Sequence, residues 1–346
     1  MARITYLLGA GASIGSLPVV DNFENEIREI LNRLRVFLGN VPDDMASTYV
    51  GDRGLIFMAI KDLQMLLEGC NKHRSVDTFA KMLFLTSHDK ERERTYRRVK
   101  CSIILFFELY RFFTNKTDKR YDAFLATIIN NANPKFPSEI NIISWNYDYE
   151  FERAYMNYSP EKKNIHEVYN DLNIIHKNSN AAKSIGNNFG IIKINGTAGF
   201  YTANKELILG LDNHFSIASG VNDKDSISVI PFLKNYKKYA DDTAVEPAIS
   251  FSWEEDKGAI KVIDEISKAV ANTQVFIIIG YSFPYFNRAI DKKIASSISY
   301  GGTTIYLQDP IADDLVDTVL ELKQWIFGSI GKIKPIKNCN QFYLNI

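Results

Sequence analysis

The chain has 346 residues, of which 46% are hydrophobic and 24% are charged, a balance that predicts a large buried core and excludes a disordered protein. The 41 Lys and Arg residues equal the 41 Asp and Glu residues in number, so the overall charge does not indicate nucleic acid or an anionic membrane as a partner. The three cysteines are far apart and form no CxxC pair, which argues against a disulfide framework or a structural zinc site. No apolar run is long enough to cross a membrane and no signal-peptide-like segment follows Met1, so we expect a cytoplasmic protein without membrane contact.

Strand-like and helix-like segments alternate along the chain, a pattern typical of α/β proteins with a mainly parallel sheet. The apolar runs predict strands over 3–8, 140–145, 190–194, 206–209, 275–279 and 303–307. Helical spacing of apolar residues predicts helices over 22–38, 53–69, 76–87, 92–114, 119–131, 149–155, 258–272 and 285–299. The segments 170–188 and 211–245 are predicted as surface loops.

Residues 40–135 contain several helical candidates and no convincing strand, which indicates a helical module inserted after the first helix. The sequence therefore predicts one domain from residues 1–39 and 136–346, and an inserted module over 40–135. Within the module, Val99, Phe106 and Phe113 belong to an aromatic-rich stripe on one side of the predicted helix. The favoured interpretation is a buried packing face, and the alternative is an assembly surface.

Three apolar runs end in small or polar residues, as buried parallel strands do when they deliver side chains to a ligand. The first run ends in Gly9-Ala10-Gly11-Ala12-Ser13. Glycines at a strand-to-helix turn let backbone N–H groups approach a diphosphate closely. The structural alternative is a tight turn whose glycines are needed only for packing.

The second run ends in Asn146 and Asp148, which alternation on an extended backbone places on the same side. An amide beside a carboxylate suits recognition of ribose hydroxyls, and the alternative is that both residues cap the helix predicted over 149–155. The third run ends in Gly280 and Ser282. The serine hydroxyl is a candidate to bond a ribose or phosphate, although a simple turn explains this segment equally well.

Together these motifs resemble the sirtuin-like family, specifically the divergent bacterial branch found in anti-phage defence proteins. The resemblance covers most of the chain and rests on four motifs in the family's order: Gly9 to Ser13, Asn146-x-Asp148, Lys193-Ile194-Asn195-Gly196-Thr197, and Gly280-Tyr281-Ser282 with Asp291 downstream. It implies an α/β fold with a Rossmann-like, mainly parallel sheet that binds NAD.

The resemblance also implies roles for individual residues. Gly9, Ala10, Gly11, Ala12 and Ser13 would cradle the pyrophosphate, Asn146 and Asp148 would act at the nicotinamide ribose, and Gly280 with Ser282 would contact the adenosine half. Asp21 follows the glycine-rich turn and is a candidate to line the pocket mouth, or to cap the helix predicted from residue 22.

The chain departs from the family in two respects. The four cysteines of a zinc ribbon are missing, so the resemblance implies NAD hydrolysis, without a metal, rather than deacylation of acetyl-lysine. Asn195 occupies the position of the family's catalytic histidine, and an amide can orient a water molecule but cannot replace general-base proton transfer. His166, His176 and His214 lie in neighbouring segments as candidate substitutes, and each is more simply read as a surface or loop residue.

Three hypotheses follow from this sequence. The chain is an NAD hydrolase that depletes the cofactor after activation in a defence complex, either as a homo-oligomer or with a partner protein. Alternatively it is a binding module that senses NAD or a related nucleotide without turnover, or a structural subunit that assembles through its aromatic-rich helix. NAD is favoured over NADP because the motifs contain no basic cluster for a 2′-phosphate.

Overall fold

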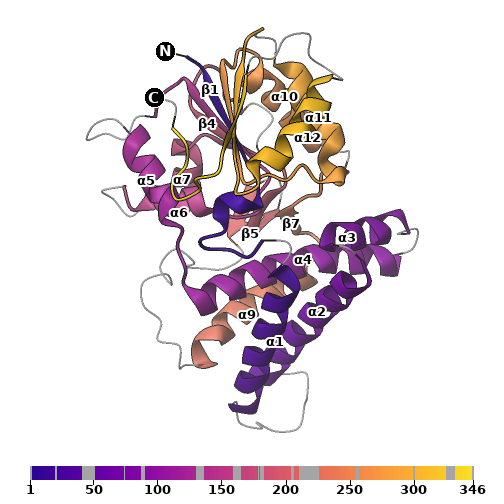
Figure 1. Cartoon of the computed structure of the whole chain (residues 1–346). Helices are drawn as coiled ribbons and strands as arrows, with labels where there is room; N and C mark the ends of the chain where they lie inside the picture. Colours follow the sequence, from indigo (N-terminus) through magenta and orange to yellow (C-terminus); the bar gives the residue numbers. More distant parts are fainter. Residues whose placement is uncertain are drawn as a thin grey trace. The chain divides into compact units, whose positions relative to one another are not determined.

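The computed structural model of the chain describes residues 2–19, 22–40, 51–73, 75–86, 90–129, 136–158, 165–177, 179, 183–203, 206–209, 226–254, 257–298, 301–324 and 332–344. The chain forms two compact units (Figure 1). The sheet unit consists of Met1–Gly15, Thr117–Thr197 and Ser250–Ile346, and the helical unit consists of Ser16–Lys116 and Ala198–Ile249.

The sheet unit is built on a seven-stranded sheet in the order β10-β9-β8-β1-β2-β4-β3, in which every neighbouring pair is parallel. Its strands are β1 (Ile4–Leu8), β2 (Ile140–Ser144), β3 (Ile174–Ile175), β4 (Gly190–Lys193), β8 (Val275–Ile279), β9 (Thr304–Gln308) and β10 (Ile333–Ile336). The central strands are mostly apolar and fully buried, as in a parallel sheet with both faces covered. The predicted α/β fold with a Rossmann-like, mainly parallel sheet is confirmed.

Helices flank both faces of this sheet (Figure 1). On one side lie α5 (Lys119–Ile128), α6 (Glu150–Met156) and α7 (Ile165–Asp171), and on the other α10 (Lys257–Val270), α11 (Arg288–Ser297) and α12 (Ala312–Gln324). Leu7, Ile143 and Ile278 of the strands share a core cluster with Val262, Ile266 and Ile294 of α10 and α11. Hydrophobic burial on both faces therefore fixes the sheet and the positions of its strand ends.

The helical unit contains α1 (Phe23–Asn40), α2 (Asp52–Lys72), α3 (Val76–Leu85), α4 (Lys90–Thr114) and α9 (Ser226–Asp241). A three-stranded sheet in the order β6-β5-β7 involves β5 (Gly196–Ala203), β6 (Glu206–Leu209) and β7 (Glu246–Ile249). Val99, Phe106 and Phe113 of α4 are buried, and the Phe106 ring packs 4.3 Å from that of Phe23. The aromatic stripe is a packing face as predicted, so it does not provide the alternative assembly surface.

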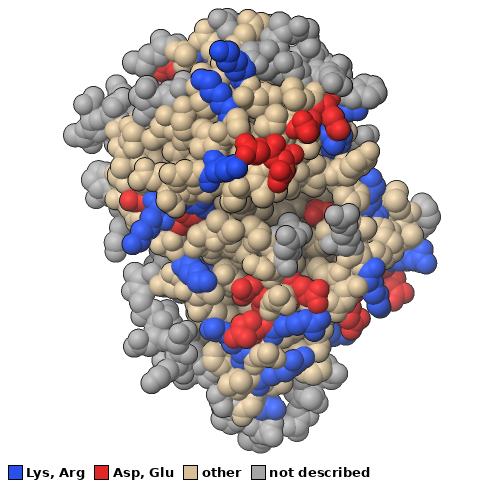
Figure 2. Space-filling model, viewed as in Figure 1, with Lys and Arg blue, Asp and Glu red and all other residues tan. Residues whose placement is uncertain are grey.

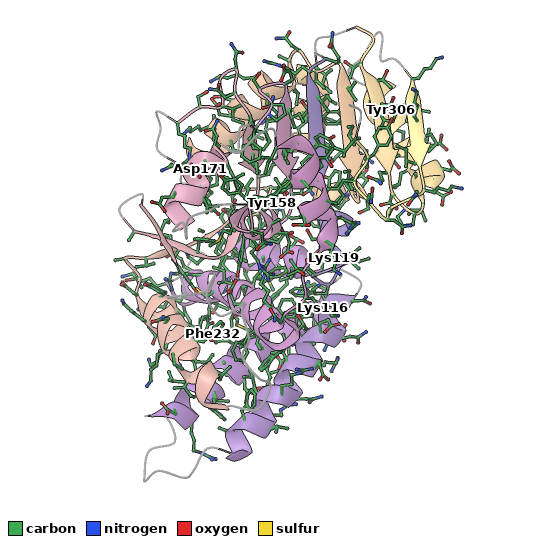
Figure 3. All side chains as sticks on the ribbon, turned by 90° about the vertical axis from the view of Figure 1, so that its left-hand side faces the viewer. Lys116, Lys119, Tyr158, Asp171, Phe232 and Tyr306 are labelled. Carbon is green, nitrogen blue, oxygen red and sulfur yellow. The ribbon has the colours of Figure 1, made fainter. Side chains whose placement is uncertain are left out.

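The observed units differ from the domains expected over 1–39 with 136–346 and over 40–135. The helix α1 belongs to the helical unit, together with residues 198–249, whereas α5 belongs to the sheet unit. The helix α5 packs against α6. Tyr158, which lies two residues after the end of α6 and is labelled in Figure 3, donates its hydroxyl to Asp122 of α5. Tertiary contacts rather than helical composition therefore decide which unit each helix joins.

Several elements lie where the sequence predicts loops or nothing. The helix α9 occupies part of 211–245, and β3 lies within 170–188. The strand predicted over 206–209 is present as β6, but it pairs in the three-stranded sheet.

On the face shown in Figure 2, the described basic and acidic side chains are intermixed. Among the described helices, none is both long and apolar enough for a membrane span.

Candidate functional site

The carboxyl ends of β1, β2, β4 and β8 meet at one edge of the parallel sheet. From β1 the chain adds strands on one side as far as β3 and β4, and then returns to add β8 on the other side of β1. The sheet order therefore reverses between β1 and β8, which is where open α/β sheets bind their ligands. The residues predicted from the sequence follow these same strands: the glycine-rich turn after β1, Asn146 and Asp148 after β2, Asn195 after β4, and Gly280 with Ser282 after β8.

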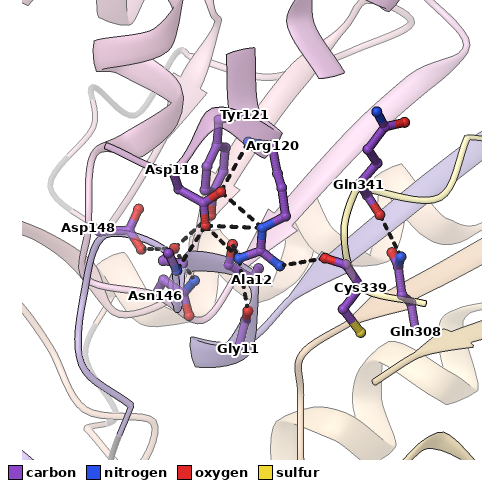
Figure 4. Close-up of polar contacts among 12 residues, drawn as sticks. Gly11, Ala12, Asp118, Arg120, Tyr121, Asn146, Asp148, Gln308, Cys339 and Gln341 are labelled. Carbon is purple, nitrogen blue, oxygen red and sulfur yellow. Dashed lines mark hydrogen bonds and ion pairs between the residues drawn. The ribbon is translucent and has the colours of Figure 1, made fainter. Parts of the chain in front are cut away.

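Asn146, Ser13 and Asp148 form a buried hydrogen-bonded cluster at this edge (Figure 4). The Ser13 hydroxyl donates to Asp148 Oδ2 at 2.6 Å, and Asn146 Nδ2 donates to Ser13 Oγ at 3.2 Å and to the Gly9 carbonyl at 2.9 Å. Both Asn146 and Asp148 thus reach one hydroxyl, as the predicted alternation requires. Asp148 Oδ1 also accepts from the backbone N–H of Glu150, the first residue of α6, so the carboxylate also satisfies one amide at the start of this helix, although the N-cap residue is Tyr149.

The glycine-rich turn (residues 9–15) packs directly against Gly280. The amides of Gly9 and Gly11 donate to the carbonyls of Ile279 and Gly280 at 3.0 and 2.9 Å. A Cβ on Gly9 would lie 2.5 Å from the Gly280 carbonyl oxygen, so packing is by itself enough to require glycine at this position. The exposed residues of the turn are Ala10, Ile14 and Gly15.

The side-chain oxygen of Asn195 has no hydrogen-bond partner among the described residues. Asn195 Nδ2 donates to the Trp145 carbonyl at 2.9 Å, while its buried Oδ1 receives no hydrogen bond. The residue is only 8% exposed, and leaving a buried acceptor unsatisfied costs about 1–3 kcal/mol. A ligand hydroxyl or N–H that donates to this oxygen would remove that cost.

Beneath the cluster, a buried ion pair supports the backbone of Asp148. Lys193 Nζ lies 2.6 Å from Glu152 Oε1 and donates to the Asp148 carbonyl at 2.6 Å. Burial raises the pKa of the Glu152 carboxyl, and the Lys193 ammonium opposes that shift. The sequence motif includes Lys193, but Glu152 was missed because its role depends on the turn of α6 and on no local pattern.

The start of α5 contributes three side chains that sequence reasoning missed (Figure 4). Arg120 Nη2 donates to the Ala12 carbonyl at 2.9 Å, Asp118 Oδ2 accepts from the Gly15 amide at 3.1 Å, and the Tyr121 hydroxyl lies 2.7 Å from Ser13 Oγ. The only local signal is an aspartate at the beginning of a helix, which is ordinary N-capping. These contacts join segments more than 100 residues apart, so no short motif reveals them.

The segment after β8 is only partly directed toward the cluster. Ser282 is exposed, whereas the Tyr281 ring stacks on Trp145 with centroids 5.7 Å apart. The Tyr281 hydroxyl donates to both oxygens of Asp291 at 2.9 and 3.0 Å, and burial raises the pKa of Asp291 to about 7. The site thus unites the turn, Asn146, Asp148 and Gly280, but leaves the Ser282 side chain at the surface. Asp21 lies outside the described residues.

Of the three candidate histidines, only the side chain of His176 is within the described residues. It lies in the loop that follows β3, which is one of the two favoured positions, but it is buried rather than at the surface. Burial lowers the pKa of His176 to about 3, with smaller contributions from Lys183, Lys193 and Lys261. A base with so low a pKa captures a proton poorly near neutral pH, so His176 is a poor candidate for a general base.

His176 is expected to weaken the fold in acid. Because its folded pKa of about 3 lies below the ordinary value of 6.5, the unfolded chain binds a proton first, and stability is lost as pH falls below 6.5. Between pH 7 and pH 5 the expected loss from this group is about 2 kcal/mol. The test is urea unfolding of wild type and His176→Gln at pH 7 and pH 5. The free energy of unfolding of wild type relative to the variant should be lower at pH 5 than at pH 7. The same difference in unfolding free energy at both pH values would contradict the prediction.

Two further findings concern metal binding and similarity to known proteins. In the described ranges, no group of three or more His, Cys, Asp or Glu side chains is placed to hold a metal ion. Comparison of the chain with protein-family models and with curated proteins gives no match in either case. The interpretation of the site therefore rests on its own geometry and chemistry.

Proposed function

We propose that this chain binds NAD at the carboxyl edge of the parallel sheet and hydrolyses the bond between nicotinamide and ribose. The observation that carries the proposal is the buried Asn146–Ser13–Asp148 cluster beside the strand-order reversal between β1 and β8. The resemblance stated above extends this proposal to a cytoplasmic defence effector that acts in a homo-oligomer or with a partner protein.

The cluster suits the charge that develops during this cleavage. When the nicotinamide–ribose bond breaks, positive charge appears on the ribose ring, and a fixed carboxylate stabilises that charge most strongly where water is excluded. Asp148 is buried and held by Ser13 and the Glu150 amide. The Asn146 amide, fixed on Gly9 and Ser13, is placed to orient a ribose hydroxyl or the attacking water.

Asn195 favours a second candidate, a module that binds the nucleotide without turnover. Its free Oδ1 is a hydrogen-bond acceptor for a ligand hydroxyl, but an amide does not take up a proton as the family's histidine would. General-base assistance contributes about 10²–10⁴-fold to a rate. The two candidates therefore share a ligand and differ in turnover.

The test is release of nicotinamide and ADP-ribose from NAD by the purified full chain. Asn146→Ala is expected to abolish release, because it removes the amide from the cluster. Asn141→Ala is the matched control: Asn141 is also a buried asparagine of this segment, but it lies near the opposite end of β2. The control is expected to keep the activity. This result would show that the activity lost in Asn146→Ala comes from removal of the site amide rather than from damage to the packing of β2.

Asn195→His distinguishes the two candidates. Turnover by wild type that is lost in Asn146→Ala supports the hydrolase. Saturable NAD binding by wild type without turnover, together with turnover gained in Asn195→His, supports the binding module. Absence of both binding and turnover in wild type contradicts both candidates.

A further inference from the structure

The glycine-rich turn is held from two directions. On one side, the amides of Gly9 and Gly11 bond the backbone after β8. On the other side, Arg120 donates to the carbonyls of Gly11 and Ala12 at 3.3 and 2.9 Å. The turn is therefore enclosed by fixed partners, although most of its residues have little or no side chain of their own.

The Arg120 guanidinium is itself firmly fixed. It is paired with the Asp118 carboxylate, and its Nη1 donates to the Cys339 carbonyl at 3.3 Å (Figure 4). Asp118 in turn accepts from the Gly15 amide. The side chains of Arg120 and Asp118 are only 12% and 3% exposed. Such a charge-assisted, forked set of contacts is one that arginine makes and lysine does not.

Holding the carbonyls of the turn also fixes its amides. A peptide unit is planar and trans, so its N–H points opposite to its C=O. Because Arg120 binds the carbonyls of Gly11 and Ala12, it fixes the two peptide units that follow them, and the Ala12 amide in turn donates to the Gly9 carbonyl at 2.9 Å. Arg120 therefore fixes the shape of the turn, and a phosphate can approach the backbone of a glycine-rich turn closely only where the turn has a defined shape.

A segment near the carboxyl terminus, residues 338–343, supports Arg120 from behind. Gln308 at the end of β9 donates to the carbonyls of Asn338 and Gln341, both at 2.6 Å, and accepts from the Tyr343 amide at 2.9 Å. The Phe342 ring lies 5.3 Å from the Arg120 guanidinium and 4.9 Å from the Tyr121 ring. The segment thus supplies both a carbonyl and an aromatic face to the residues that hold the turn.

We propose that Arg120 is a positioning residue that fixes the glycine-rich turn for the diphosphate of NAD, and that residues 338–343 stabilise it in that position. This inference rests on the proposed function, because it assumes that NAD or ADP-ribose binds at the turn. The turn also contacts the residues proposed to act at the ribose, because Ser13 of the turn bonds both Asn146 and Asp148. Loss of Arg120 is therefore expected to weaken nucleotide binding and also to lower the rate of the bound complex.

The test compares Arg120→Lys, Arg120→Ala and Gln308→Leu with wild type. The measurements are the dissociation constant of ADP-ribose by calorimetry and KM and kcat for NAD. Arg120→Lys keeps the positive charge beside Asp118 but loses the guanidinium that bonds the carbonyls of Gly11 and Ala12. We therefore expect KM and the dissociation constant to rise about tenfold, the equivalent of one charge-assisted hydrogen bond. The kcat is expected to fall as well, because Ser13 of the same turn bonds Asn146 and Asp148, and Gln308→Leu shifts binding in the same direction by less.

Arg153→Ala is the matched control, because the Arg153 side chain is similarly buried, at 15% exposed, and pairs with Glu150. Thermal unfolding of all variants separates affinity from stability, since a purely structural arginine would lower the unfolding temperature and the active fraction but leave KM unchanged. If wild type binds ADP-ribose and Arg120→Lys binds it equally well, the positioning role is wrong and the proposed function stands. If wild type binds neither NAD nor ADP-ribose, the proposed function is wrong.

Discussion

Replacing Gly280 with alanine is expected to destabilise the protein by about 3 kcal/mol or more and to abolish nucleotide binding. Gly280 has φ +60°, a conformation that side chains rarely adopt, and a Cβ there would lie 2.4 Å from both the Ala12 nitrogen and the Gly11 carbonyl carbon. These are backbone atoms, which cannot rotate away as the end of a side chain can. Relief of the clash therefore requires the glycine-rich turn to move away from β8.

Gly186→Ala is the control for this prediction. Gly186 has the same φ of +60°, but nothing lies within 4 Å of the Cβ that the substitution adds. This variant therefore shows the conformational cost alone, about 1–2 kcal/mol, with binding retained. The measurements are urea unfolding and ADP-ribose calorimetry. Equal destabilisation in the two variants would show that the turn adapts to a side chain at position 280.

Replacing Asp291 with asparagine is expected to stabilise the protein in mild alkali. Burial raises the pKa of the Asp291 carboxyl in the folded protein to about 7 from an ordinary 3.8. The protonated carboxyl therefore contributes fully to the stability of the fold below about pH 4, and this contribution is lost as the pH rises through 7. An amide keeps an acceptor for the Tyr281 hydroxyl but carries no charge to bury. At pH 8, Asp291→Asn is expected to be more stable than wild type by up to about 4 kcal/mol.

Asp171→Asn provides the comparison, because Asp171 also receives a tyrosine hydroxyl, that of Tyr155 at 2.9 Å, but is exposed on α7 (Figure 3). Unfolding free energies are measured for wild type and both variants at pH 4 and pH 8. The advantage of Asp291→Asn should grow between these pH values, and that of Asp171→Asn should not. If the stability gained over wild type changed equally with pH in the two variants, the charged form of Asp291 would not be destabilised by burial.

The parts of the fold that the sequence predicts well are those with local signals. The strands β1, β2 and β8 are buried along their whole length and mostly apolar, because the sheet is covered on both faces. Their ends could be recognised because small or polar residues follow directly. For the same reason the grouping of Ser13, Asn146 and Asp148 could be anticipated, since parallel strands bring their carboxyl ends to one edge.

The parts that could not be predicted depend on weak local signals or on distant contacts. The helix α9 contains Pro231 in its first half, which indicates a break when only the sequence is read. The strand β10 contains Pro335 and lies at the sheet edge, where a missing N–H is tolerated. Arg120 belongs to a helix start of ordinary composition, and only the folded chain brings it to Gly11 and Ala12.

The central position of β1 also determines when the sheet unit can be completed during synthesis. Ile4 of β1 pairs with Ile140 of β2 on one side and with Val275 of β8 on the other. One edge of the innermost strand therefore stays open until the ribosome has made most of the chain, and contacts of such sequence separation form slowly. An unpaired apolar edge invites pairing with other chains, so the nascent chain is exposed to such pairing at its first strand until β8 emerges.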